Sequence, residues 1–215
     1  MKRTLVRIAF LAAVALLAST AVYADSVTLA SLGYASDHGQ TNSSGSPTIA
    51  IDPNAAWSSA LGTSSWVSYT TSGNTNDSNY VQVANGTVTK FFDSFNLLGT
   101  PNSGSIEVMA DDSTSVILNG HLLVAEASTT NNTYSTCSDF AIGCKGAYVI
   151  DLPTDYLFNG DNLLEFDVAQ RAGVSYGLDY YGTINTTTAV PEPSSMLLLG
   201  TGLSAVVMRF RKKVK

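Results

Sequence analysis

Basic residues are scarce in the middle of this 215-residue sequence. Of its eleven lysines and arginines, only Lys90, Lys145 and Arg171 lie between residues 25 and 189. The same stretch carries sixteen aspartates and glutamates, so its formal charge is −13, whereas the whole chain has −6. Because so acidic a surface repels polyanions, we expect it to bind neither nucleic acid nor anionic lipid.

Residues and motifs typical of catalytic centres are also rare. The two histidines, His38 and His121, are not accompanied by a nucleophile in a Gly-x-Ser-x-Gly turn. Carboxylates are numerous enough for a glycosidase pair, but such a pair needs a defined separation in a cleft, which sequence does not give. A solubilising surface explains these carboxylates more simply. We therefore predict that the protein is not an enzyme.

Long apolar runs are missing except near the two ends, and both of those runs are short. At the N-terminus, three basic residues precede the apolar segment Ile8–Ala18, and the chain then reaches Val22-Tyr23-Ala24, with small residues where signal peptidase needs them. This order is typical of a secretory signal peptide. We predict a signal peptide at 1–24, cut by signal peptidase between Ala24 and Asp25. An uncleaved N-terminal anchor is the alternative, although the run is short for a membrane span.

The C-terminal end combines a rigid tripeptide, an apolar run and a basic tail. Pro191, Glu192 and Pro193 should be extended, because proline fixes φ and constrains its neighbour. Residues 194–208 carry no charge, and as a helix they would reach roughly 22 Å, less than the roughly 30 Å of a bilayer core. We expect a transient membrane stop with the cations on the cytoplasmic side. These cations are Arg209, Arg211, Lys212, Lys213 and Lys215.

This C-terminal arrangement resembles the PEP-CTERM sorting signal of Gram-negative bacteria. Proteins of that family are exported, held briefly in the inner membrane and processed by an exosortase. The resemblance implies an exosortase-type partner, an inner-membrane intermediate and a final place at the cell surface or outside the cell. An ordinary short C-terminal anchor is the alternative.

Between the terminal segments we expect one domain, because about 165 residues suffice for a single core. The predicted organisation is a signal peptide at 1–24, an ectodomain at 25–184, a spacer at 185–190 and the sorting signal at 191–215. Cys137 and Cys144 are the only cysteines. In an oxidising compartment they should form a disulfide worth about 2 kcal/mol. Two cysteines alone make a poor metal site.

The ectodomain reads as β-structure. Apolar residues alternate with polar ones at 105–110, 164–168 and 176–180, as in strands with one wet face. Asn119-Gly120 separates the apolar runs 115–118 and 121–125, which predicts a hairpin with a type I′ turn. Weaker candidates are 27–32, 66–69, 81–83, 87–97 and 148–152. About ten short strands and no convincing helix predict an all-β, two-sheet antiparallel sandwich.

Two segments carry a second resemblance. The segment 105–120, SIEVMADDSTSVILNG, has an Asp-rich turn leading into a strand that ends in Asn-Gly, and 160–168, GDNLLEFDV, begins a later strand with a Gly-x-Asn turn. Together, over about 87–182, they resemble galactose-binding-like jelly rolls. The resemblance implies a jelly-roll sandwich, but fold alone does not establish sugar binding.

Two kinds of binding site are conceivable. Asp111 and Asp112, with Asp161 from another loop, could give carboxylate oxygens to calcium; the alternative, which we favour, is that the pair caps a turn. The aromatic side chains of Trp57, Trp66 and Tyr134 could stack on sugar rings. Aromatic residues in such positions more often fill a core or plug a loop. No other cofactor is expected.

Taken together, the sequence predicts an exported, non-enzymatic surface or extracellular-matrix protein. The PEP-CTERM resemblance implies association with exopolysaccharide in a biofilm or floc. The alternative is a carbohydrate-binding module that recognises a specific glycan. A third hypothesis is an ice-binding protein with the same tail, which would need flat threonine ladders, whereas Thr186, Thr187 and Thr188 fall in the predicted spacer.

Overall fold

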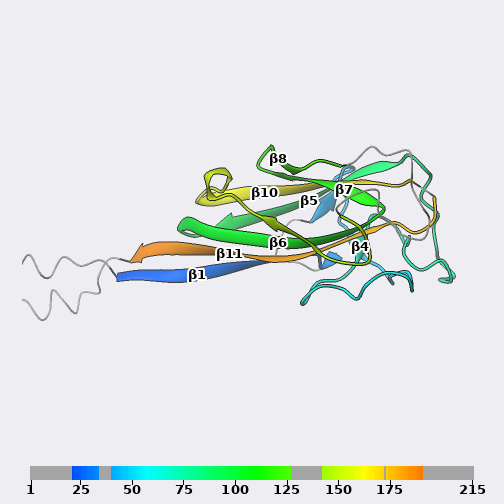
Figure 1. Cartoon of the computed structure of the whole chain (residues 1–215), viewed down its shortest axis with the longest axis horizontal. Helices are drawn as coiled ribbons and strands as arrows, with labels where there is room; N and C mark the ends of the chain where they lie inside the picture. Colours follow the sequence, from blue (N-terminus) through cyan, green and yellow to red (C-terminus); the bar gives the residue numbers. More distant parts are fainter. Residues whose placement is uncertain (1–20, 34–39, 127–141, 172, 191–215) are drawn as a thin grey trace, which may run out of the picture. The chain divides into compact units, whose positions relative to one another are not determined.

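The computed structural model describes residues 21–33, 40–126, 142–171 and 173–190 (Figure 1). Residues 24–187 form one compact unit, and the described residues 21–23 and 188–190 belong to a second unit. The predicted apolar tail and most of the predicted signal peptide lie outside the described residues. Within those residues, no helix is both long and apolar enough to cross a membrane.

The described residues build two antiparallel sheets. The first has the strand order β3-β4-β11-β6-β9, and β1 also pairs with β11. Its strands are β1 (Ala21–Ala30), β3 (Ile49–Ala50), β4 (Val67–Ser68), β6 (Thr100–Asp111), β9 (Tyr148–Asp151) and β11 (Gly177–Val190). We call it sheet A.

The second sheet, sheet B, has the order β2-β5-β10-β7-β8. Its strands are β2 (Thr41–Asn42), β5 (Val88–Leu97), β7 (Ser113–Leu118), β8 (His121–Val124) and β10 (Gly160–Ala169). A short 3-10 turn, η2 (Thr154–Tyr156), precedes β10. The five longest strands alternate between the sheets along the chain, since β1, β6 and β11 lie in sheet A while β5 and β10 lie in sheet B. The predicted all-β, two-sheet jelly-roll sandwich is confirmed.

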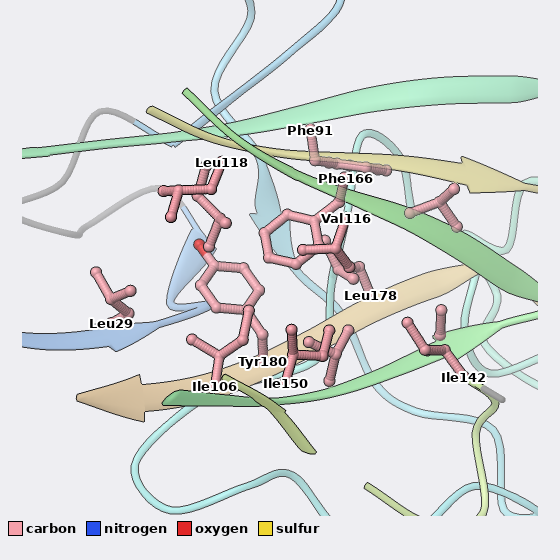
Figure 2. Close-up of a cluster of buried hydrophobic side chains, with 14 of the residues drawn as sticks. Leu29, Phe91, Ile106, Val116, Leu118, Ile142, Ile150, Phe166, Leu178 and Tyr180 are labelled. Carbon is pink, nitrogen blue, oxygen red and sulfur yellow. The ribbon is translucent and has the colours of Figure 1, made fainter. Parts of the chain in front are cut away.

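Alternating apolar residues explain why these segments form strands. In β5 and β10, every second side chain is buried, among them Phe91, Phe95, Leu164 and Phe166. Figure 2 shows Phe91 and Phe166 of sheet B and Ile106 of sheet A in one apolar core. Burying one such side chain stabilises the folded protein by about 1.5–3 kcal/mol relative to leaving it exposed.

One buried polar contact connects the two sheets inside this core. Asp93 of β5 and Tyr180 of β11 are both buried, and the Tyr180 hydroxyl donates to Asp93 Oδ2 at 2.8 Å. Burial and the neighbouring Asp93 carboxylate raise the pKa of Tyr180 well above its usual value, so the phenol keeps its proton.

The Asn-Gly turn predicted from sequence connects β7 to β8. Asn119 has φ 49° and Gly120 has φ 82°, which are the positive values that a type I′ turn requires. The Asn119 side chain also donates to Tyr156 O at 2.7 Å and accepts from Leu163 N–H at 2.8 Å. Asn119 therefore both permits the turn and connects it to β10.

A second apolar cluster lies on the other face of sheet A. In β6, Ile106 and Val108 point into the main core, whereas Met109 belongs to a separate cluster with Trp57 and Trp66. The segment 51–66 supplies both tryptophans, so it covers the outer face of sheet A. Sequence periodicity did not predict this cover.

The structure differs from the predicted strands at two places. Residues 81–83 are not a strand, and β11 continues to Val190 through the segment 185–190 that the sequence suggested as a spacer. Thr186 and Thr187 pair with Pro101 and Thr100 of β6, after a register shift that follows Asn185.

Candidate functional site

Two adjacent carboxyl groups are buried at the end of β6. Asp111 and Asp112 are 6% and 3% exposed. The Trp57 indole N–H donates to Asp111 Oδ2 at 2.6 Å, and the backbone N–H of Arg171 donates to Asp112 Oδ2 at 2.6 Å. The pair thus binds the segment 51–66 on one side and the loop after β10 on the other.

This environment changes the acidity of the pair. Burial, followed by the charge of Asp112, raises the pKa of Asp111 from 3.8 to about 8, although the Trp57 hydrogen bond works in the opposite direction. At neutral pH the pair therefore retains a proton that an exposed carboxyl would have lost. Such a pair can store a proton and hold neighbouring segments together.

Further polar contacts surround the pair at the same end of the sandwich. The guanidinium of Arg171 forms an ion pair with Glu126, which also accepts from Ser113 Oγ at 2.8 Å. Asn54 Nδ2 donates to Ser175 Oγ at 2.7 Å. The carboxylates of Asp111 and Asp112 thus accept hydrogen bonds from donors of the protein itself. This supports the turn-capping interpretation of the pair.

Asp161 does not join the other two predicted calcium ligands. Asp112 N–H donates to the carbonyl of Ala169, at the end of β10, whereas Asp161 is the second residue of that strand and accepts from Asn96 Nδ2 at 2.8 Å. Eight residues of extended strand separate the two places by roughly 26 Å. In the described part of the chain, no group of three His, Cys, Asp or Glu side chains could hold a metal.

Both tryptophans proposed as sugar-stacking residues are buried. Trp57 is 9% and Trp66 is 2% exposed, and their ring centroids are 4.2 Å apart. Trp57 packs against Gly177, where an added Cβ would come within 2.9 Å of the indole ring. Neither ring offers a free face for a sugar, so the core interpretation fits both residues.

The remaining predicted residues can be placed only in part. Tyr134 and Cys137 lie outside the described residues, as do Pro191, Glu192, Pro193 and the basic tail. Cys144 is fully buried beside Met109 and the tryptophans. Its disulfide with Cys137 stays a prediction. Ala24 and Asp25 lie within β1, and Thr186 is buried and donates to Leu98 O rather than forming a flat threonine ladder.

An exposed polar and aromatic face on sheet B is a candidate that sequence reasoning missed. Lys90 of β5 pairs with Glu165 and Asp167 of β10, and Phe92, half-buried, lies opposite Glu165. Burial is the main cause of the raised pKa of Asp167, and Lys90 acts against it. The alternation of apolar and polar residues in β5 and β10 indicates that these residues lie on the polar face of their strands. It does not indicate that the two strands are neighbours in the sheet.

Comparisons with known proteins identify the tail. Residues 189–212 match the PEP-CTERM protein-sorting motif. The chain is therefore an all-β sandwich with a PEP-CTERM sorting signal, and that signal marks an exported protein with a membrane-anchored C-terminal sorting segment. No curated protein matches the sequence.

Among solved structures, the sandwich is similar to parts of carbohydrate-active proteins. One is a β-porphyranase from Bacteroides plebeius, with 14% identity, TM-score 0.32 and coverage of 51% of this chain and 19% of that one. Another is an α-L-rhamnosidase from Streptomyces avermitilis, with 14% identity, TM-score 0.40 and coverage of 72% of this chain and 15% of that one. A third is a family 35 carbohydrate binding module from Clostridium thermocellum, with 13% identity, TM-score 0.33 and coverage of 77% of this chain and 98% of that one. The chain spans less than a fifth of the first two, and likenesses this distant support no argument about function.

Proposed function

We propose that this protein is an exported, exosortase-processed and non-enzymatic component of the cell surface or extracellular matrix, associated with exopolysaccharide. The observation that carries the proposal is the PEP-CTERM motif at 189–212, which begins in the last two residues of β11. The sorting signal thus follows a folded, acidic sandwich without an intervening domain. Signal peptidase would remove residues 1–24, and the exosortase would act at the other end.

The geometry of the carboxyl pair supports a non-enzymatic role. A glycosidase needs two carboxyl groups several ångströms apart on either side of a cleft. Asp111 and Asp112 are instead neighbours in sequence, are buried, and accept hydrogen bonds from Trp57 and from the backbone of Arg171. The pair therefore suits a structural role.

Mass spectrometry of both termini of the protein isolated from its own host tests this proposal. We expect a mature N-terminus at Asp25 and a C-terminus that lacks the basic residues after Met208. In a strain without exosortase activity, the same tail should remain attached and the protein should stay with the membrane fraction. A cytosolic protein that ends at Lys215 would contradict the proposal.

The alternative is a carbohydrate-binding module, and the exposed face of sheet B is the observation that favours it. An aromatic ring, Phe92, beside the charged groups of Lys90 and Glu165 offers both stacking and hydrogen bonding. Residues 25–190 can be tested on a glycan array and against the host's own exopolysaccharide. Phe92→Ala should abolish selective binding, whereas Val149→Ala on the exposed edge strand β9 should not. Uniform silence on both would refute this alternative.

A further inference from the structure

Strand β1 runs antiparallel to β11 beyond the point where β6 stops. The pairing of β11 with β6 ends at Thr187, opposite Thr100, although β11 itself continues to Val190. On the other side, β4 pairs with β11 only at Leu178. Among the described strands, β1 alone is therefore available to pair with residues 188–190.

The register of this pairing follows from one hydrogen bond. Ser31 N–H, directly after β1, donates to Tyr180 O at 3.0 Å. Opposite residues of an antiparallel pair keep a constant sum of residue numbers. Counting from that bond places Tyr23 opposite Thr188 and Ala21 opposite Val190. Figure 1 shows β1 and β11 side by side along this length.

The partner of residues 188–190 is therefore the part of β1 that signal peptidase is expected to remove. Cleavage between Ala24 and Asp25 takes away 21–24 and leaves 25–30 paired with β11. The last three residues of β11 then lose their neighbouring strand. Pro191 has no N–H and cannot extend the ladder further.

We propose that removal of the signal peptide releases residues 188–190 from β1 and thereby makes the adjacent Pro-Glu-Pro segment available to its processing protease. Enzymes that bind an extended peptide need its backbone groups free for hydrogen bonding. While β1 is whole, the backbone groups of Thr188 and Val190 are engaged in a strand pair. Cleavage at one end of the chain thus precedes and permits cleavage at the other. This inference rests on the exosortase processing proposed above.

The test blocks signal-peptide cleavage and follows the tail in the native host. Ala24→Tyr removes the small residue before the predicted cleavage site, and Ala21→Tyr removes the one that would permit a cut after Ser19-Thr20-Ala21. Tyrosine also favours the strand conformation. Two net backbone hydrogen bonds lower the fraction of molecules in which residues 188–190 are separated from β1 by about tenfold. We therefore expect about tenfold slower tail cleavage in a pulse-chase experiment.

A third substitution distinguishes strand pairing from a general effect of the retained signal peptide. Adding Tyr23→Pro to the double variant removes the N–H that this register directs at Thr188 O, and so disrupts the pairing of 21–24 with β11 while the signal peptide remains attached. Tail cleavage should return to the rate of the unaltered protein. Native-rate cleavage in the double variant, or no recovery in the triple variant, would overturn the inference.

Hydrogen exchange gives a readout that does not depend on exosortase. The amides of Thr188 and Val190, which this register directs at β1, should be protected in the double variant, purified in lipid nanodiscs, and should exchange rapidly in the triple variant and in the protein that begins at Asp25. Equal exchange in all three would also overturn the inference. If the tail of the unaltered protein stays whole in its host while these amides behave as expected, the proposed processing is refuted and the strand release is not.

Discussion

Asparagine at position 111 keeps the shape of Asp111 but cannot carry its charge. In the folded protein the pKa of Asp111 is about 8, compared with 3.8 for the free group. The folded state thus holds this proton more tightly than the unfolded state does. The contribution of Asp111 to stability is complete below pH 4, decreases as the pH rises from 4 to 8, and changes little above 8.

The size of the effect follows from the shift. One pKa unit corresponds to about 1.4 kcal/mol, so four units give at most about 5 kcal/mol between pH 4 and 8. We therefore expect about 1 kcal/mol per pH unit between pH 5 and 8. Asp111→Asn should remove this dependence and should be more stable than the unaltered protein at pH 8. The side-chain oxygen of asparagine can still accept from the Trp57 indole.

Urea unfolding of residues 25–190 at several pH values measures this directly. The free energy of unfolding of the unaltered protein should fall from pH 5 to 8 more steeply than that of Asp111→Asn. Asp151→Asn, at an exposed position of β9, serves as the matched control and should keep the steeper slope. Equal slopes for the unaltered protein and Asp111→Asn would refute the reasoning about the buried pair.

Three further predictions concern stability, each measured by urea unfolding. Asn119→Ala should destabilise the fold by about 1–3 kcal/mol, because the turn has positive φ and the side chain makes three hydrogen bonds to other segments. Asn119→Gly, which restores only the backbone freedom, should recover part of the loss. Tyr180→Phe should cost about 1–3 kcal/mol, because buried Asp93 loses the hydroxyl donor, and an unchanged midpoint would contradict this. If the predicted disulfide forms, Cys137→Ala should cost about 2 kcal/mol and reductant should then have no additional effect on that variant; a reductant-insensitive unaltered protein would show that Cys137 and Cys144 are not paired.

Local signals predicted the parts of the molecule that depend on neighbouring residues in the sequence. The tail motif is linear, so Pro191, Glu192 and Pro193 could be recognised without any fold. The alternation in β10 and the Asn119-Gly120 turn are likewise local, and both were confirmed. The sandwich followed from the number of such strands and the lack of helices.

Contacts between distant residues could not be predicted in this way. Trp57 and Asp111 are 54 residues apart, and no periodicity indicates that the indole of one satisfies the carboxylate of the other. The cover over the outer face of sheet A comes from an irregular segment, so the sequence favoured a core role for its tryptophans without indicating which face of which sheet they cover. Pairing of β1 with β11 spans the largest sequence separation among the strand pairs that the structure describes.

The hydrogen bond between Tyr180 and Asp93 has a consequence for how the two layers align. Apolar side chains tolerate small sliding movements, because one methyl group can replace another at little cost. A phenol and a carboxylate in a dry interior do not, since even a modest offset breaks their directional bond and leaves polar atoms in hydrocarbon. The contact therefore selects one alignment of the two sheets among several that apolar packing alone would make nearly equal in energy.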